Sequence, residues 1–273
     1  MRPGDSVTLA ALLFLIVAGV ITRRTHRISV RQLQRISGLG LLGLALIAAM
    51  QALSRHFPTS AQALGDWLPC LQMLIVYWQA GQFYGTPNQK LQSWLVGFDQ
   101  RWLGAFSNRF ARRWKTSWVG SYFEFAYLFC YALIPLGVGV LYWATLRSVI
   151  DEYWSTVLPA SYLCYVLVPF AQTLPPRMLR PAGSIPQPRQ KIRSFNLFIL
   201  RHASIHLNTF PSAHVASTIA ASLVLIGHLP AVGVVFLLIA LSIAAGAVLG
   251  FYHYSLDVIL GAALGICVRC LRG

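Results

Sequence analysis

The chain is poor in acidic residues and in charge of any sign. Only 7 of its 273 residues are Asp or Glu and 11% are charged, whereas 56% are hydrophobic. Soluble globular proteins carry roughly 25% charged residues, so the composition excludes that class and indicates an integral membrane protein. No acidic cluster exists that could bind a metal ion, and we expect a site that uses neither metal nor cofactor.

Two further absences concern disulfides and a signal peptide. The cysteines are odd in number and irregularly spaced, which excludes a disulfide framework; they are Cys70, Cys130, Cys164, Cys267 and Cys270. No small-residue cleavage site follows the first apolar run at 6–22, because Thr22, Arg23 and Arg24 come next. We therefore expect this run to be a retained anchor.

Long apolar runs are what the sequence has instead. They predict about eight transmembrane helices, at 6–22, 37–53, 64–81, 120–144, 154–174, 211–228, 231–249 and 253–270. The third run contains Asp66, Gln72 and Gln79, so we expect it to pack inside the bundle. The prediction is an all-α, polytopic membrane helix bundle, with an N-terminal transmembrane hairpin at 1–60 and a second domain at 61–273.

Two basic segments do not fit as membrane spans. In residues 85–118, Trp94, Phe98 and Trp102 recur at helical spacing among charged residues. This pattern indicates an amphipathic helix in the membrane interface, with an ordinary surface helix as the alternative. Residues 175–207 are rich in Pro and Arg. Because proline disfavours a helix interior, we expect this connection to be extended and to cover one end of the bundle.

The net charge of +15 comes from 22 Lys and Arg residues. They lie between apolar segments, so we expect lipid headgroups and phosphate substrates as partners, and no nucleic acid. With eight spans, 17 of the 22 fall in the segments 23–36, 82–118 and 175–207, which share one membrane face. Such an excess of positive charge indicates that this face is cytoplasmic.

The last quarter of the chain carries the candidate chemistry. The string N-T-F-P-S-A-H occupies 208–214, and H-Y-S-L-D occupies 253–257. The apolar residues between them predict two membrane helices joined by a turn at 227–230. Such a hairpin returns the chain to the face it left, so His214 and His253 should lie on the same side at the same depth.

Each of these strings has a chemical logic. Thr209 can cap a helix whose first turn holds Pro211 and Ser212, and the free amides at a helix N-terminus bind anions. If the second string is helical, His253 and Asp257 share one face. The carboxylate can then fix one ring nitrogen while the other acts as a nucleophile. The structural alternative is a satisfied ion pair beside an interfacial histidine.

A polar stripe occurs on the fourth predicted span. Glu124, Tyr127 and Tyr131 are spaced i, i+3 and i+7, which places them on one helix face. We expect them to pack against neighbouring helices, with binding of a substrate hydroxyl as the alternative.

Three motifs resemble those of the type-2 phosphatidic acid phosphatase superfamily. F-P-S-A-H at 210–214 and H-Y-S-L-D at 253–257 resemble its second and third signatures, in the branch of the fungal inositol phosphorylceramide synthases. The H-Y-x-x-D string also resembles the sphingomyelin synthases. Pro175-Pro176-Arg177, followed by Arg180-Pro181, is similar to the first signature of that branch.

The chain departs from the plain phosphatase pattern at two places. Thr173 stands where a lysine is expected, and Gly246-Ala247 stands where Ser-Arg is expected. Both departures favour the phosphotransferase-like branch. The resemblance implies a six-helix phosphatase-like core within residues 61–273.

The resemblance also implies a His/His/Asp site. His253 would be the nucleophile, His214 the general acid and base, and Asp257 the carboxylate that orients His253. The implied ligands of the substrate phosphate are Arg177, Arg180 and Ser212.

The implied function is an integral membrane phosphotransferase or phosphatase that acts on lipid phosphate esters through a phosphohistidine. We expect a lipid phosphate substrate in the bilayer, a polar alcohol acceptor such as inositol, and location in the cell membrane. Relatives usually work on the outer or lumenal side, so the side of the site stays open. The alternatives are a plain lipid phosphate or isoprenyl pyrophosphate phosphatase, a non-catalytic membrane carrier, and an intramembrane hydrolase with Ser212 or Ser255 as nucleophile. The serine hydrolase lacks a G-x-S-x-G elbow.

Overall fold

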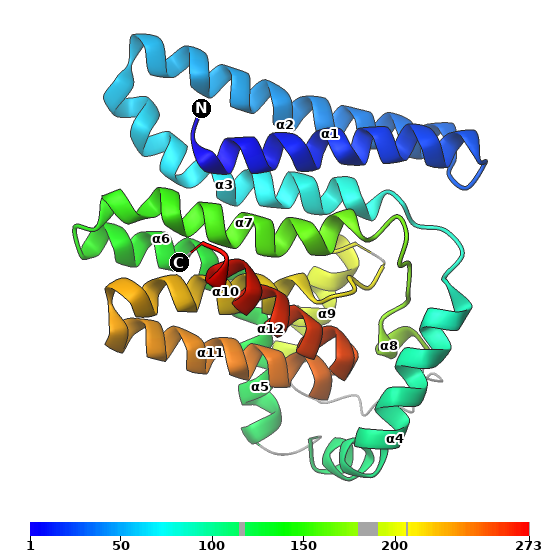
Figure 1. Cartoon of the computed structure of the whole chain (residues 1–273). Coiled ribbons are helices and arrows are strands. Elements are labelled where there is room, and N and C mark those ends of the chain that lie inside the picture. The colour runs from blue at the N-terminus through cyan, green and yellow to red at the C-terminus, as the bar shows by residue number, and fades with distance from the viewer. Residues whose placement is uncertain (115–117, 180–190, 206, 273) are drawn as a thin grey trace.

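The structure, a computed structural model, describes residues 1–114, 118–179, 191–205 and 207–272, and within them it consists of helices joined by loops. The bundle helices are α1 (Pro3–Arg24), α2 (Val30–His56), α3 (Pro58–Gly81), α5 (Trp118–Leu128), α6 (Cys130–Trp143), α7 (Ile150–Val166), α10 (Ala213–His228), α11 (Pro230–Leu249) and α12 (Ser255–Cys270). Most of them run side by side and alternate in direction (Figure 1), except that α6 continues from α5 after a bend of 59°. The predicted all-α class is confirmed for these residues.

Shorter or separate elements complete the described chain. They are α4 (Gln89–Trp114), the 3-10 helix η1 (Arg147–Val149), α8 (Pro176–Leu179) and α9 (Lys191–His202). An isolated antiparallel bridge joins Thr173 to Asn208. The α1–α2 turn, α4, α8 and α9 lie toward one end of the bundle (Figure 1), which we call the site end. The start of α1 and the end of α12 lie at the opposite end.

Within the described residues, α1, α2 and α11 are long and apolar enough to cross a membrane. The pair α5 and α6, bent by 59°, adds a fourth span if it crosses as one. Helices α7, α10 and α12 have only 17, 16 and 16 residues, fewer than the roughly 20 that cover the bilayer core. The eight predicted crossings therefore stay a prediction.

Helix α3 packs inside the bundle, as its polar residues predicted. Asp66, Gln72 and Gln79 are all buried. The side-chain amide of Gln79 donates to the backbone carbonyls of Leu12 at 3.2 Å and Ile36 at 3.1 Å. Since these carbonyls belong to α1 and α2, one buried amide joins three helices where hydrocarbon offers no competing partner.

Ion pairs fasten the end of the bundle opposite the site end. Asp66 on α3 binds Arg2 and Arg147, each at 2.7 Å. Glu152 on α7 binds the His228 ring at 2.9 Å and Arg269 at 3.5 Å. These contacts connect α1, α3, α7, α10 and α12, so the charged residues at this end of the bundle hold the helices together.

Two glycines bring α12 against α10. Gly261 and Gly265 are four residues apart and face the same neighbour, the small-xxx-small pattern of tightly packed membrane helices. A Cβ at Gly261 would lie 2.5 Å from the backbone oxygen of Ser212, and one at Gly265 would lie 2.5 Å from that of Ala216. Only glycine allows this approach, which places the start of α12 beside the start of α10.

Helix α4 crosses the site end of the bundle (Figure 1). Its Leu95 is buried, whereas Trp94 and Trp102 are 53% and 69% exposed, as an interfacial helix requires. The Asp99 carboxylate accepts hydrogen bonds from the backbone N–H and the hydroxyl of Ser255, at the first turn of α12. Burial raises the pKa of Asp99, and the Ser255 hydrogen bonds oppose that shift. The amphipathic helix is confirmed, and its position in the interface stays a prediction.

The expectation of an extended 175–207 segment is wrong for its described parts. Residues 176–179 and 191–202 are helical. In α9, Arg193, Asn196 and Leu200 are buried, which is one helical face at spacings of three and four. The last proline of the 175–207 segment lies at 188, so the prolines that suggested an extended chain do not reach α9.

We predict that Gly261→Ala destabilises the protein, while Gly38→Ala does not. A Cβ at Gly261 meets a backbone oxygen that cannot move aside, and overpacking of this kind costs about 1–3 kcal/mol. Gly38, in α2, has open space around its Cβ position, and alanine there should stabilise the helix by roughly 0.5–1 kcal/mol. Thermal unfolding in detergent measures both variants. Equal melting temperatures would contradict the tight α10–α12 contact.

Candidate active site

The two histidines predicted to meet do meet, at the site end of the bundle. The ring centroids of His214 and His253 are 5.9 Å apart, with an interplanar angle of 82°. His214 stands in the first turn of α10, and His253 precedes α12. The out-and-back path of α10 and α11 produces this meeting, as the hairpin argument predicted.

Asp257 holds the segment that carries His253. Its Oδ2 atom accepts hydrogen bonds from Nδ2 of Asn208 at 2.7 Å and from the backbone N–H of Tyr254 at 3.0 Å, and it lies 3.3 Å from Nδ1 of His253. Its backbone oxygen accepts from the N–H of Ser212 at 3.0 Å. Asp257 is fully buried, so its charge acts in a medium that screens it weakly.

The geometry of this contact differs from the expected helical face. Helix α12 begins at Ser255 with Tyr254 as its N-cap, so His253 lies outside the helix. Asp257, in the first turn, reaches back to the cap N–H and to the ring. The carboxylate thereby caps α12 and orients His253 at once, which a helical i, i+4 pair would not do.

The start of α10 also differs from the prediction. The helix begins at Ala213 with Ser212 as N-cap, so Pro211 and Ser212 precede the first turn. Thr209 still contributes, because its Oγ1 accepts from the N–H of Ala213 at 3.4 Å. Ser212 is fully buried, and its hydroxyl has no hydrogen-bond partner among the described residues.

Arg177 lines the same pocket as the two histidines and contacts Tyr252, the residue before His253. Its backbone N–H donates to the oxygen of Phe251 at 3.1 Å, and its guanidinium carbon is 5.9 Å from the centre of the Tyr252 ring. The Tyr127 ring stacks on Tyr252 at 4.0 Å. Stacking and cation–π contacts therefore fix the residue that precedes His253.

A buried charge network supports Tyr252 from behind. The Glu124 carboxylate accepts from Arg193 at 2.5 Å, from Nδ2 of Asn196 at 2.8 Å and from the Tyr252 hydroxyl at 2.5 Å. All four residues are buried. This carboxylate is fully engaged by protein groups, which supports the packing interpretation of Glu124. Tyr127 and Tyr131 instead place their rings edge-on to His214, at 6.0 and 5.6 Å.

The two histidines, Arg177 and Tyr252 line one pocket, which we call the polar pocket. Among the described residues, its polar lining comprises Tyr77, Tyr127, Arg177, Ser204, Asn208, Thr209, His214, Tyr252 and His253. Three of the predicted site residues line it, and Asp257 lies directly behind His253. Ser212 is not among its described lining residues, and Arg180 lies outside the described part of the chain.

Sequence reasoning missed Asn208, although it stands in the quoted string. Its amide joins Asp257 at 2.7 Å to the Thr173 hydroxyl at 3.2 Å. Thr173 was noted only as a departure from the phosphatase pattern, and here it anchors the residue that holds Asp257. Sequence reasoning missed Arg193 as well. The segment was interpreted as a proline-rich connection, so the short amphipathic helix that buries Arg193 was not predicted.

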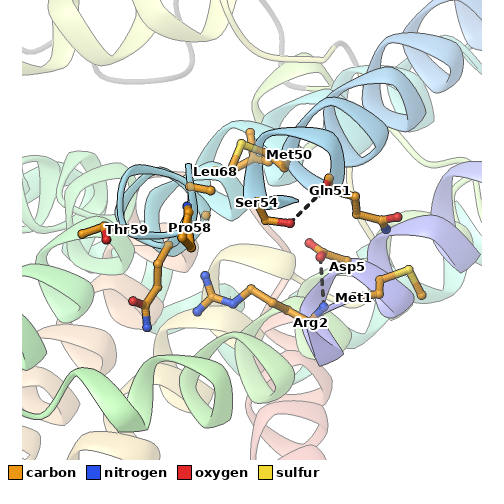
Figure 2. A pocket seen from close by; sticks show the side chains of 12 residues that line it. Met1, Arg2, Asp5, Met50, Gln51, Ser54, Pro58, Thr59 and Leu68 are labelled. Atoms are coloured by element: carbon orange, nitrogen blue, oxygen red, sulfur yellow. Dashed lines mark hydrogen bonds between the residues drawn. The ribbon is translucent and has the colours of Figure 1, made fainter. Parts of the chain in front are cut away.

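A second pocket lies between the start of α1 and the α2–α3 turn (Figure 2). Arg2 extends into it, but this guanidinium is bound by Asp66 at 2.7 Å and by Asp151 at 2.6 Å. The pocket contains none of the predicted site residues and lies at the end opposite the histidines. We therefore assign the candidate chemistry to the polar pocket.

Comparison with known proteins agrees with this placement. A sequence model of the PAP2 superfamily matches residues 93–271, which is more than half of the chain and runs from the second turn of α4 to the residue after α12. No curated protein and no solved structure matches significantly. The superfamily predicted from the motifs is confirmed, and the branch stays a prediction. With its apolar helices and this match, the chain is an integral membrane protein that belongs to the PAP2 superfamily, whose members are generally phosphatases and phosphotransferases of phosphate esters.

Proposed function

We propose that this protein is a membrane enzyme that transfers the phosphoryl group of a lipid phosphate ester through a phosphohistidine at His253. The observation that carries the proposal is the convergence of His214, His253 and Arg177 on one pocket, with Asp257 behind His253. A structural ion pair alone would need neither a second histidine nor an arginine at the same pocket.

In the first step, Nε2 of His253 attacks phosphorus, a P–N bond forms and the ester P–O bond breaks. Asp257 keeps the proton on Nδ1 and stabilises the positive charge that develops on the ring. His214 gives a proton to the departing alkoxide, which leaves as an alcohol. The ring centroids of the two histidines are 5.9 Å apart, so both rings are near enough to act on the same phosphoryl group.

In the second step, an acceptor hydroxyl loses its proton to the now neutral His214 and attacks phosphorus. The P–N bond breaks, and His253 returns to its neutral state. Cationic and N–H donors stabilise the charge on the equatorial oxygens. We assign this role to Arg177, with Arg180, Ser212 and the first amides of α10 as further candidates.

The acceptor decides the reaction class. Water makes the enzyme a lipid phosphate or isoprenyl pyrophosphate phosphatase, whereas an alcohol such as inositol makes it a phosphotransferase. The motif departures at Thr173 and Gly246-Ala247 support the second class, in the manner of inositol phosphorylceramide synthase. We further propose that the enzyme works in the cell membrane.

A labelled phospholipid panel, with and without inositol or ceramide, tests the proposal on purified protein. Released phosphate indicates a phosphatase, and a new labelled lipid or inositol phosphate indicates a transferase. A carrier would produce neither product and no labelled protein.

We predict that His253→Ala abolishes turnover and that Asp257→Asn leaves a trace. The first change removes the nucleophile, whereas the second keeps the imidazole but no longer fixes its tautomer. Turnover of a lipid phosphate by folded, detergent-purified variants provides the measurement. Near-normal activity of His253→Ala would show that the nucleophile lies elsewhere.

We predict that His214→Ala loses far more activity on a lipid phosphate than on p-nitrophenyl phosphate. An alkoxide needs a proton to leave and p-nitrophenolate does not, and general acid–base help is worth about 10²–10⁴-fold. Phosphohistidine should still form from the aryl substrate and should accumulate, because the same residue activates the acceptor. Labelling with the aryl phosphate detects it, provided that the reaction is stopped at alkaline pH, because the P–N bond of phosphohistidine is labile in acid.

The matched control for this prediction is His228→Ala, a histidine at the other end of the same helix. His228 binds Glu152 and lies away from the polar pocket, so both activities should persist. Equal losses on both substrates in His214→Ala, with no trapped intermediate, would limit His214 to binding or structure.

A further inference from the structure

A second, largely apolar pocket adjoins the histidines. We call it the apolar pocket; its volume is about 250 Å³. Helix α3 contributes Met73 and Leu74, α6 contributes Ile134 and Pro135, and α10 contributes His214. A cavity with such a lining favours hydrocarbon over water. Among its described lining residues, His214 is the histidine that also belongs to the candidate active site.

The apolar and polar pockets share two residues, Tyr77 and His214. The Tyr77 hydroxyl lies 2.5 Å from Oγ of Ser204 and accepts from the N–H of Ile205 at 3.0 Å, on the polar side. The Tyr77 ring lies 5.5 Å from that of Tyr165, which lines the apolar side. A molecule that fills both pockets would therefore place a polar group and a hydrocarbon group on opposite sides of this pair.

The apolar pocket opens at the side of the bundle, between α3 and α6. Leu74 and Tyr131, which line it from these two helices, are 38% and 37% exposed. Exposed apolar side chains surround this region on α3, among them Trp67 and Leu71. Exposed apolar surface of this kind marks membrane or protein contacts, and on a membrane helix bundle we infer that the opening faces the lipid.

The wall that α3 provides lies outside the matched family segment, which begins at residue 93. The opposite wall follows the 59° bend between α5 and α6. Pro135 in α6 lacks the N–H that a straight helix would use at this position. The shape of the pocket is thus set by two features. One is α3, which the family match does not include, and the other is the bend between α5 and α6, which it does include.

We propose that the apolar pocket holds the hydrocarbon chain of the lipid phosphate whose phosphate lies at His214 and His253, and that α3 selects this chain. The proposal rests on the proposed function for the phosphate end only. The chain would enter sideways between α3 and α6, and Tyr77 and His214 would mark the boundary between chain and headgroup.

The test is a substitution that fills the pocket from its exposed rim. Leu74→Trp should raise KM for a long-chain lipid phosphate by about tenfold or more, because apolar burial dominates binding of the chain. Its activity on p-nitrophenyl phosphate, which has no chain, should stay within about twofold of the parent, a difference we treat as negligible. The control is Leu71→Trp, a change on the same helix at a residue that is 45% exposed and lies outside the described lining of the apolar pocket. It should change neither KM for the lipid phosphate nor activity on p-nitrophenyl phosphate.

Cys70 gives a readout that does not need turnover. It is a half-buried free thiol on the wall of the apolar pocket. With the exposed Cys267 and Cys270 replaced by Ser, an apolar maleimide should alkylate Cys70 in nanodiscs, and Cys70→Ser identifies that signal. A long-chain alkylphosphonate, whose P–C bond resists transfer, should protect Cys70, whereas inorganic phosphate should not.

Two results would overturn the inference: equal losses on both substrates in Leu74→Trp, or the same alkylation rate of Cys70 with and without the alkylphosphonate. A parent protein without phosphatase or transferase activity would contradict the proposed function instead. In that case the protection of Cys70 still decides whether the pocket binds a chain.

Discussion

The carboxylate of Asp257 is the interaction on which the rest of the site depends. A fully buried anion is costly unless protein dipoles replace its water. Here Asn208, Tyr254 and His253 surround one oxygen, and the backbone of Asp257 accepts from Ser212. Three chain segments must therefore meet at one point before the charge is satisfied. That requirement positions both histidine-bearing segments relative to each other.

Close packing makes this meeting possible. Gly261 lets α12 approach the backbone of Ser212, and the Glu124–Arg193 pair fixes α9 beneath Tyr252. Breaking a buried pair of this kind typically costs about 3–5 kcal/mol. The residues nearest the polar pocket are thus held in place by contacts with the protein around it.

The bundle places two different environments side by side. The polar pocket offers arginine and imidazole, whereas the apolar pocket between α3 and α6 offers a largely apolar wall. Tyr77 and His214 belong to both. On the proposed function, an amphiphilic substrate would bind without removing its chain from an apolar medium, and only its headgroup would exchange water for protein donors.

The sequence alone predicted the long apolar helices and the meeting of His214 with His253. Both follow from local signals: apolar runs of spanning length and two polar strings at the ends of a hairpin. The sequence also identified the superfamily, because each motif is an unbroken string of residues that can be recognised without the structure. It did not predict that His253 precedes α12, that α9 is helical, or that Asn208 and Arg193 hold the site. Those outcomes depend on hydrogen bonds between residues 49 and 69 positions apart, and only the packed bundle decides which buried polar groups become partners.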